Sequence, residues 1–375
     1  MEGKVLLKLS ILIYSLASGG AEKQVSVLLK ELSNKYKIQL VLMNDTIFYD
    51  VPENVEIKFL EKSEPNENGI LKFLKLPILG WKYKRLIKNC DVSISFMNRP
   101  NYINIFAKVF GSKVKTIVSE RAMPSLQHNK GIQGKINKLL IKLLYPLSDM
   151  VISNSKGNGL DLKNNFGIKN IKVIYNFVEK VKCKKIYQGE FIFISVGRMD
   201  EGKNHKLLIE SFYKANLDAK LWLIGDGPLR KNLEKMVKNL KLENKVIFWG
   251  RQKNVYEFLS KANCFVFGSN YEGFPNVLLE ALLCGLPVIS TDCKSGPREI
   301  LTPDTDILKQ TDDIEIAEYG ILTKVGSVES MKKAMRLMCK NKELRYNFAK
   351  KSQNRVKEFE VEKIIKEWER VINGK

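Results

Sequence analysis

Two carboxylates, Glu272 and Glu280, are separated by seven residues in an otherwise apolar segment. Glu280 falls within the nearly continuous apolar run 277–283, which predicts a buried helix. Burying a carboxylate without a partner is costly, so two interpretations remain open. Either Glu280 caps or pairs with a buried Lys or Arg, or it accepts hydrogen bonds from the neighbouring hydroxyls of a ribose. In the second case, the free N–H groups at the helix N-terminus face a phosphate.

Two cations, Arg198 and Lys203, follow the predicted buried strand 191–196 and are five positions apart across a turn that contains Gly202. At this spacing the two side chains can converge on one anion. Arginine offers a forked, bidentate contact, and lysine offers a compact point charge. The alternative is that both are surface cations beside an ordinary turn.

A loop, a helix, a helix stop and a strand over residues 269–289 position the two carboxylates. Pro275 suits the first position of the helix, because its missing N–H group costs nothing there. Gly285 suits the helix C-terminus, and Pro287 prevents the helix from continuing. We therefore expect a strand to begin at Val288.

The chain begins with a pattern typical of a doubly wound α/β domain. A strand is predicted over 5–14, a glycine turn over 18–20 and an amphipathic helix over 21–32. The full Gly-x-Gly-x-x-Gly is absent, so we do not expect a dinucleotide site here, and a plain βα turn is the alternative. Residues 4–21 also resemble a short signal peptide, but Lys8 interrupts the apolar run, and a first buried strand suits it better.

Composition and charge limit the possible classes of protein. The 375 residues suit two domains, and 44% hydrophobic content permits real cores. The formal charge of +22, with a basic excess in both halves, implies nucleic acid, an acidic membrane or a phosphorylated ligand, unless surface lysine is simply abundant. The six cysteines have no paired spacing and are expected to be reduced thiols of a cytosolic protein. Two histidines cannot supply a His-rich metal site.

Two segments, 70–87 and 129–144, combine lysines with apolar and aromatic residues at helical spacing. Such segments suit an anionic membrane surface, although core helices with a solvated lysine face are an alternative. Pro77 and Gly80 are expected to break the first segment in two. No stretch reaches the roughly 20 uncharged residues that span a bilayer.

Together, these motifs resemble those of the retaining family-4 glycosyltransferases. The resemblance is carried by Glu-x7-Glu with Gly273-Phe274 after the first Glu, by Gly-Arg-x4-Lys at Arg198 and Lys203, and by a Gly-Gly turn near the N-terminus. It implies an α/β chain with the GT-B fold, in which two doubly wound Rossmann-like domains face a cleft. The implied divisions are an acceptor-binding domain over 1–180, a nucleotide-sugar-binding domain over 181–358, and a C-terminal helix over 359–375 that crosses back to the first domain.

The resemblance also implies roles for individual residues. Arg198 and Lys203 hold the donor diphosphate, Glu272 contacts the donor sugar, and Glu280 binds the ribose. The other donor-binding residues that it implies are Gly225, Gly227, Gly250, Arg251, Gly273, Phe274, Pro275, Asn276 and Val277. On the acceptor side it implies Gly19, Gly20, Ala21 and Arg121. Arg121 stands where many family members have histidine, so it is expected to meet an anionic acceptor.

The N-terminal half is most similar to bacterial transferases that add N-acetylgalactosamine to undecaprenyl-diphosphate-linked glycans. The implied function is retaining transfer from a UDP-sugar to such a lipid-linked acceptor, without a metal or other cofactor, by a peripheral protein on the cytoplasmic face of the inner membrane. Alternatives are a hexosyl or N-acetylglucosaminyl transferase for O-antigen or capsule, and a sugar-nucleotide epimerase of the same fold. A nucleic-acid partner is not expected, because a basic recognition helix and an aromatic stacking platform are not evident.

Overall fold

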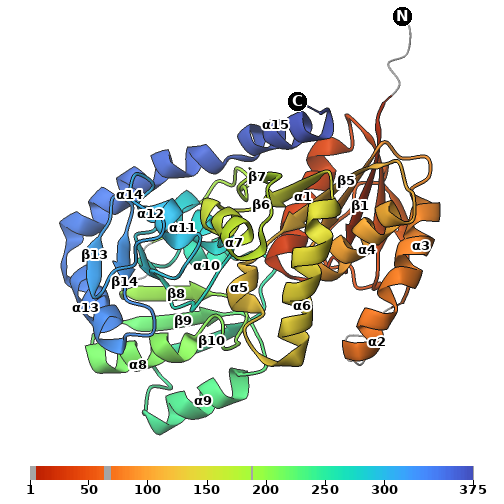
Figure 1. Cartoon of the computed structure of the whole chain (residues 1–375). Helices are drawn as coiled ribbons and strands as arrows, with labels where there is room; N and C mark the ends of the chain where they lie inside the picture. The colour runs from red at the N-terminus through yellow and green to blue at the C-terminus, as the bar shows by residue number, and fades with distance from the viewer. Residues whose placement is uncertain (1–5, 63–68, 187–188, 375) are drawn as a thin grey trace, which may run out of the picture. The chain divides into compact units, whose positions relative to one another are not determined.

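A computed structural model describes residues 6–62, 69–186 and 189–374, and the chain divides into two compact units. The first unit comprises Met1–Tyr175 and Ile365–Lys375, and the second comprises Asn176–Ile364. The first division falls after Tyr175, five residues before the predicted boundary at residue 180, so residues 176–180 belong to the second unit. Figure 1 shows both units as sheets covered by helices. Residue 5 of the predicted first strand and residue 375 of the predicted C-terminal helix lie outside the described residues.

The first unit contains a seven-stranded parallel sheet with the order β3-β2-β1-β4-β5-β6-β7. Its strands are β1 Lys8–Ile13, β2 Lys37–Leu42, β3 Glu56–Phe59, β4 Val92–Phe96, β5 Lys115–Glu120, β6 Met150–Ser153 and β7 Ile171–Val173. The chain reverses its direction across the sheet between β1 and β4, and ligands of such sheets bind beyond the carboxyl ends of the strands at this reversal. The central strands β1 and β4 are almost wholly buried, and their apolar residues are interrupted by small serines.

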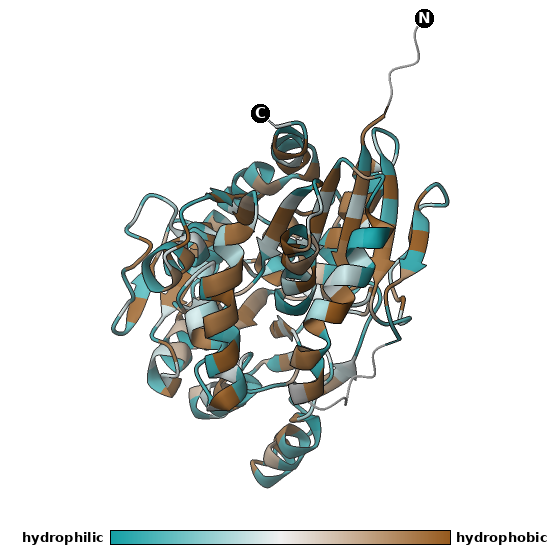
Figure 2. Cartoon of the chain, turned by 45° about the vertical axis from the view of Figure 1, so that its right-hand side comes forward, coloured by the Kyte–Doolittle hydropathy of each residue, from teal (hydrophilic) through white to brown (hydrophobic). Residues whose placement is uncertain are grey.

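The helices of the first unit are α1 Gly20–Leu32, α2 Gly69–Leu74, α3 Leu76–Leu86, α4 Asn98–Val109, α5 Pro124–Gln127, α6 Gly131–Leu144, η1 Tyr145–Leu147 and α7 Lys156–Phe166. The expected break between α2 and α3 comes at Lys75, before Pro77, and the expectation of a break at Gly80 is wrong. Gly80 instead lets α3 approach α4, since an added Cβ would lie 2.4 Å from the Cβ of Phe106. The alternation of teal and brown along the helices in Figure 2 shows their amphipathic character.

The second unit contains a seven-stranded sheet with the order β10-β9-β8-β11-β12-β14-β13, in which only the β13–β14 pair is antiparallel. Its strands are β8 Ile192–Val196, β9 Lys220–Ile224, β10 Val246–Gly250, β11 Cys264–Phe267, β12 Val288–Thr291, β13 Ile314–Ile316 and β14 Ile321–Thr323. Its helices are α8 His205–Ala215, α9 Arg230–Asn239, α10 Tyr256–Leu259, α11 Asn276–Leu283, α12 Pro297–Leu301, α13 Val328–Lys340, α14 Lys342–Val356 and η2 Lys357–Phe359. Two doubly wound α/β units confirm the predicted fold class.

The last helix, α15 Val361–Ile372, begins in the second unit and ends in the first. Trp368 is buried, and its ring centre lies 5.7 Å from that of Phe96 at the end of β4. The Glu369 carboxylate lies 2.5 Å from Lys35 Nζ. The C-terminal turn of the chain is therefore part of the first unit's packing.

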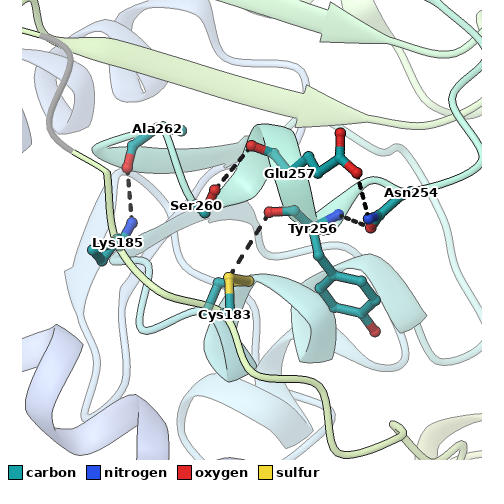
Figure 3. The surroundings of a disulfide bond; sticks show 8 residues. Cys183, Lys185, Asn254, Tyr256, Glu257, Ser260 and Ala262 are labelled. Carbon is teal, nitrogen blue, oxygen red and sulfur yellow. Dashed lines mark hydrogen bonds between the residues drawn. A yellow bond between two sulfur atoms is a disulfide. The ribbon is translucent and has the colours of Figure 1, made fainter.

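Two findings concern the cysteines and the membrane. Cys183 and Cys284 form a disulfide, so the expectation of six reduced thiols is wrong for this pair; sequence spacing gave no signal because the two residues are 101 positions apart. Figure 3 shows the surroundings of the bond. No helix in the described parts of the chain combines the length and the apolar character that crossing a bilayer requires.

Candidate active site

The turn between β8 and α8 places Arg198 and Lys203 at the carboxyl edge of the second sheet. Lys203 Nζ lies 2.5 Å from Oε1 of Glu272, so these two residues, 69 positions apart, form an ion pair. The Arg198 side chain is 73% exposed, with its Nε 3.7 Å from the Asp200 carboxylate. Asp200 also accepts a hydrogen bond from the Lys203 backbone N–H at 3.0 Å. The turn therefore presents one cation held by a partner and one that extends into solvent.

The glycines after β9 allow two backbone segments to meet. A Cβ on Gly225 would lie 2.0 Å from the carbonyl oxygen of Gly197, and one on Gly227 would lie 2.5 Å from that of Met199. Gly225 also has φ +131°, which favours glycine, and its N–H donates to the Gly250 carbonyl at 2.8 Å. Three of the predicted donor-side glycines thus bring β8, β9 and β10 together at one edge.

The loop before α11 is fixed on both sides by side chains that bond to its backbone and to Asn276. Asn176 Nδ2 donates to the Phe274 carbonyl at 2.7 Å and to Asn276 Oδ1 at 2.6 Å. Ser295 Oγ donates to the Gly273 carbonyl at 2.6 Å. This anchoring leaves the loop with little freedom, and it also brings Glu272 towards Lys203.

Helix α11 begins one residue later than expected. Pro275 is its N-cap, with extended backbone angles (φ −76°, ψ 107°), so the prediction of Pro275 as the first helical residue is wrong. The N-cap position suits proline because that residue's N–H group has no partner to lose within the helix. Val277, which follows Asn276 at the helix start, is half-buried. Phe274 is buried against the ring of Phe359, with centres 5.3 Å apart.

Glu280 lies inside α11 and is only 5% exposed. Tyr256, at the start of α10, is its neighbour: burial raises the pKa of the Tyr256 phenol, and the negative charges of Glu280 and Glu179 raise it further. The Glu280 carboxylate and the Tyr256 phenol therefore lie close enough to interact electrostatically. Arg251, after β10, is exposed at the same end of the sheet.

The acceptor-side residues lie in the first unit, at the carboxyl ends of β1 and β5, with β4 between those strands. Gly19 is the N-cap of α1, and Gly20 and Ala21 are its first residues. Arg121 follows β5, and its guanidinium lies 5.7 Å from the centre of the Phe96 ring. Burial lowers the pKa of Arg121 to about 10, against the opposing charge of Glu120, so it remains a cation at neutral pH.

A buried carboxylate holds the Arg121 loop in place. Glu120 accepts hydrogen bonds from the Tyr145 hydroxyl at 2.7 Å, from Asn98 at 3.2 Å and from the backbone N–H of Arg121 at 3.0 Å. Desolvation raises the pKa of Glu120, and the hydrogen bonds from Tyr145 and from the backbone of Arg121 oppose the rise. Met97, just before Asn98, has φ +74°, a strained conformation of the kind found at functional edges.

Sequence reasoning did not assign roles to Asn176, Ser295 or Glu120. Asn176 and Ser295 act on backbone carbonyls that are distant in sequence, and no local pattern reveals such contacts. A signal for Ser295 was its place before Gly296 and Pro297 in a loop that follows a strand. Across residues 6–62, 69–186 and 189–374, no group of three or more His, Cys, Asp or Glu side chains is arranged to hold a metal ion.

Comparisons with known proteins cover nearly the whole chain. Residues 177–355 match the family model described as "Glycosyl transferases group 1". The chain is 41% identical over 370 residues to the N-acetylgalactosamine-N,N'-diacetylbacillosaminyl-diphospho-undecaprenol 4-alpha-N-acetylgalactosaminyltransferase of Campylobacter jejuni subsp. jejuni serotype O:2, covering 96% of this chain and 98% of that protein.

Two solved structures are similar in fold. Sucrose-phosphate synthase from Thermosynechococcus elongatus has a TM-score of 0.82 at 17% identity, covering 98% of both chains. The Anabaena protein HepE, in complex with UDP and glucose, has a TM-score of 0.77 at 18% identity, covering 98% of this chain and 100% of that one.

Proposed function

Since this chain belongs to the group 1 glycosyltransferases and has their GT-B fold, we propose that it transfers N-acetylgalactosamine from a UDP-sugar to a lipid-diphosphate-linked glycan. The proposed pathway is the assembly of a bacterial surface glycan or protein glycan. The observation that carries the proposal is the convergence of the Arg198 turn, the Lys203–Glu272 pair and the start of α11 at one sheet edge. The similarity to the Campylobacter enzyme, which extends through both units, favours this donor and acceptor.

The donor diphosphate is the group that this edge is suited to hold. Arg198 extends from the turn and offers two parallel N–H donors. Lys203 adds a point charge, and the free N–H groups at the start of α11 add the positive end of a helix dipole. These groups stabilise the negative charge that grows on the leaving UDP, which is where electrostatic preorganisation lowers the barrier.

The two acids bind the rest of the donor. Glu272 accepts hydrogen bonds from the donor sugar, and Lys203, its ion-pair partner, contacts the diphosphate. Glu280 accepts hydrogen bonds from the ribose hydroxyls, and its burial strengthens them. The turns at Gly225, Gly227 and Gly250, with Arg251, lie around the nucleotide.

Transfer proceeds with retention at the anomeric carbon by a front-face route. The leaving phosphate helps to remove the proton from the acceptor hydroxyl, so no protein nucleophile is required. The cations and the helix N-terminus supply the charge stabilisation, and we propose that no metal or other cofactor takes part. Gly19, Gly20 and Ala21 contact the acceptor, and Arg121 meets its diphosphate.

An anionic membrane surface is the proposed site of action, on the cytoplasmic face of the inner membrane. Helices α2, α3 and α6 of the first unit expose large apolar side chains, and lysines alternate with them. We call this set the basic apolar surface: Leu71, Leu74, Ile78, Trp81, Ile132, Leu139 and Leu143, with Lys72, Lys75, Lys82, Lys135, Lys138 and Lys142. Insertion of the apolar side chains and attraction of the lysines to acidic lipids would act together.

The experiment is a transfer assay with purified protein, a panel of UDP-sugars and undecaprenyl-diphosphate-linked acceptors, in the presence and absence of EDTA. We expect UDP release and lipid-extractable product from UDP-N-acetylgalactosamine, unchanged by EDTA. Transfer only from another sugar would assign the enzyme to a different donor, as in a hexosyl or N-acetylglucosaminyl transferase. Conversion of the donor sugar without an acceptor would identify an epimerase, and activity that EDTA abolishes and a divalent ion restores would contradict the metal-free mechanism.

A further inference from the structure

The segment that follows Asn176 is bound along the second unit. Lys180 Nζ lies 3.3 Å from Glu360 and 3.0 Å from Glu362, close to the start of α15. Further along, the Ile186 N–H donates to the Ser260 carbonyl at 3.0 Å, and Lys185 Nζ donates to the Ala262 carbonyl at 2.8 Å. Figure 3 shows the Lys185 contact. We call residues 180–186 the docked segment.

A disulfide fastens the docked segment to α11. Cys183 lies in this segment, and Cys284 is the C-cap of α11. Their Cα atoms are 5.0 Å apart, within the usual range for bridged cysteines, so the backbone already holds the pair at bonding separation. The Cys284 N–H donates to the carbonyl of Glu280 at 3.2 Å, one helical turn back. The bond is therefore one turn away from the buried carboxylate.

Helix α10 also lies next to Cys183. Cys183 Sγ lies 3.9 Å from the Tyr256 carbonyl (Figure 3). Burial raises the pKa of the Tyr256 phenol, and the charge of Glu280 adds to the rise, so the phenol lies near that carboxylate. Any movement of Cys183 away from α11 thus acts on two elements that border Glu280.

We propose that Cys183 and Cys284 are a reversible thiol–disulfide site that controls nucleotide affinity by fixing α10 and α11 around Glu280. The proposal rests on the proposed function in one respect, the binding of the nucleotide ribose by Glu280. With the bond formed, the docked segment holds the C-terminal end of α11, and the Glu280 region is preorganised for UDP. With the bond broken, this covalent restraint is absent and the site must be ordered on binding.

The chemistry is an exchange with a thiol reductant. A thiolate attacks Cys183 Sγ to form a mixed disulfide, the bond between Cys183 and Cys284 breaks, and Cys284 leaves as a thiolate that takes up a proton. A second thiol then attacks the mixed disulfide and releases Cys183 as a thiol, so the protein gains two electrons and two protons while the reductant becomes a disulfide. The reverse exchange, with a small-molecule or protein disulfide as oxidant, restores the bond.

Exposure favours Cys183 as the position of attack. It is half-buried, whereas Cys284 is buried. Its sequence neighbours Lys182 and Lys184 are exposed, and their charge attracts an anionic thiolate such as that of glutathione. The remaining cysteines offer a contrast, because burial raises the pKa of the thiols of Cys90, Cys264, Cys293 and Cys339, which disfavours their reactive thiolate forms.

The test uses the full chain in an oxidised and a dithiothreitol-reduced form, with differential alkylation and mass spectrometry to score each cysteine. UDP affinity is measured by calorimetry on both forms. The variant Cys183→Ser removes the bond while leaving buried Cys284 in place, Cys339→Ser is the matched control outside the disulfide, and Glu280→Ala is the reference for loss of the proposed ribose contact. Hydrogen exchange of the α11 peptide gives a readout that does not require UDP.

We expect reduction to weaken UDP binding by about fivefold, the lower end of typical coupling between two sites, and to speed exchange in α11. Cys183→Ser should bind UDP like the reduced protein under both conditions, and Cys339→Ser should respond like the wild type. Equal UDP affinity and equal exchange in the two forms would overturn the proposal, as would free thiols at Cys183 and Cys284 in the oxidised protein. Faster exchange on reduction without UDP binding in either form would support the disulfide as a restraint on α11 but would contradict its control of nucleotide affinity and the donor assignment.

Discussion

At the scale of single residues, the carboxyl edge of the second sheet combines one exposed and one paired cation. We call this edge, where we propose that the sugar donor binds, the donor edge. Arg198 extends into solvent, whereas Lys203 is partly buried and bound to Glu272. The exposed Arg198 gains little stability from its contact with Asp200, so its charge is better explained by ligand binding than by folding. The proposed task of both cations is to stabilise the diphosphate as UDP leaves.

Replacing either cation should reduce turnover, and for the exposed Arg198 the effect on stability should be small. We expect Arg198→Ala and Lys203→Ala each to lower kcat by roughly 10²-fold or more, the scale for loss of one preorganised electrostatic contact. Steady-state kinetics with a UDP-sugar measures this effect. Lys206→Ala is the control, because Lys206 is exposed on α8 and faces Glu210 at 3.7 Å. Near-normal turnover in Arg198→Ala or in Lys203→Ala would contradict the proposal that these two cations bind the donor diphosphate.

His205, at the start of α8, predicts a pH dependence of stability. The residue is 2% exposed, both ring nitrogens lack a hydrogen-bond partner among the described residues, and burial lowers its pKa from 6.5 to about 4, helped by the charge of Lys203. The folded state therefore binds the proton less readily than the unfolded state. The resulting stability is present above pH 6.5 and is lost as the pH falls towards 4.

The expected loss from His205 between pH 7 and pH 4 is about 3 kcal/mol, since one pKa unit corresponds to about 1.4 kcal/mol. His205→Leu should lack this component, so the unfolding free energies of wild type and variant should converge or cross as the pH is lowered. Denaturant unfolding at several pH values measures the difference between them. A difference that stays constant from pH 7 to pH 4 would show that His205 does not titrate in this way.

Local motifs in the sequence nominated the candidate site residues. Arg198, Lys203, Glu272 and Glu280 were proposed because of their spacing relative to glycines and apolar runs, and the structure brings Lys203 and Glu272 together as an ion pair. Asn176 was not given a role, since its contact with Phe274 joins positions 98 residues apart. Local sequence does not record contacts of that kind.

At the scale of elements, close backbone approaches shape the donor edge. Gly227 lies against the backbone of Met199, whose N, C and O atoms are all within 2.8 Å of where a Cβ would stand. Backbone cannot move aside as a flexible side chain can. The turn after β9 and the turn after β8 are thus fitted to each other.

Gly227→Ala should destabilise the second unit by about 1–3 kcal/mol through overpacking. Gly159→Ala is the matched control: Gly159 lies within α7, and its added Cβ would make only ordinary contacts of 3.6 Å or more. That control should be neutral or slightly stabilising, because alanine favours helices. Thermal or denaturant unfolding measures the stability of both variants. Equal stability of Gly227→Ala and Gly159→Ala would show that the turns after β8 and β9 can move apart without destabilising the unit.

Most elements could be predicted because buried parallel strands and amphipathic helices have distinct patterns. Strand β3 received no prediction, and its largely exposed side chains explain the weak signal. The wrong break at Gly80 has a different origin. Glycine within a helix usually signals a break, but here it signals the close packing of α3 on α4, which depends on tertiary structure.

At the scale of the whole molecule, the charge of +22 and the basic apolar surface are the basis of the proposed approach to a lipid-linked acceptor at a membrane. Ile132 is 78% exposed and Ile78 is 59% exposed, which is unusual for isoleucine. Both belong to helices that also present lysines. Acidic lipids would attract the lysines first, and the apolar side chains would then insert.

The double variant Ile78→Ser, Ile132→Ser should bind acidic phospholipid vesicles about tenfold more weakly, given the energy of burying such side chains. Vesicle co-sedimentation at low and high salt measures this, and salt should weaken binding of the wild type by screening the lysines. Tyr346→Ser is the control, since Tyr346 is 68% exposed on α14 of the second unit. Equal binding by the double variant and the control would argue against this surface.

The whole-molecule properties differ in how far the sequence could predict them. Two α/β domains follow from chain length and from repeated strand–helix patterns. The disulfide does not, because Cys183 and Cys284 meet only after the docked segment has folded along the second unit.

The decisive measurement is the anomeric configuration of the product, determined by NMR after transfer from UDP-N-acetylgalactosamine to an undecaprenyl-diphosphate-linked acceptor. The donor sugar is α-linked to UDP, so retaining transfer should give a lipid-linked glycan extended by an α-linked N-acetylgalactosamine. A β-linked product would contradict the front-face mechanism at the Arg198–Lys203 edge. The absence of any sugar transfer, with this donor and acceptor both supplied, would contradict the proposed substrates.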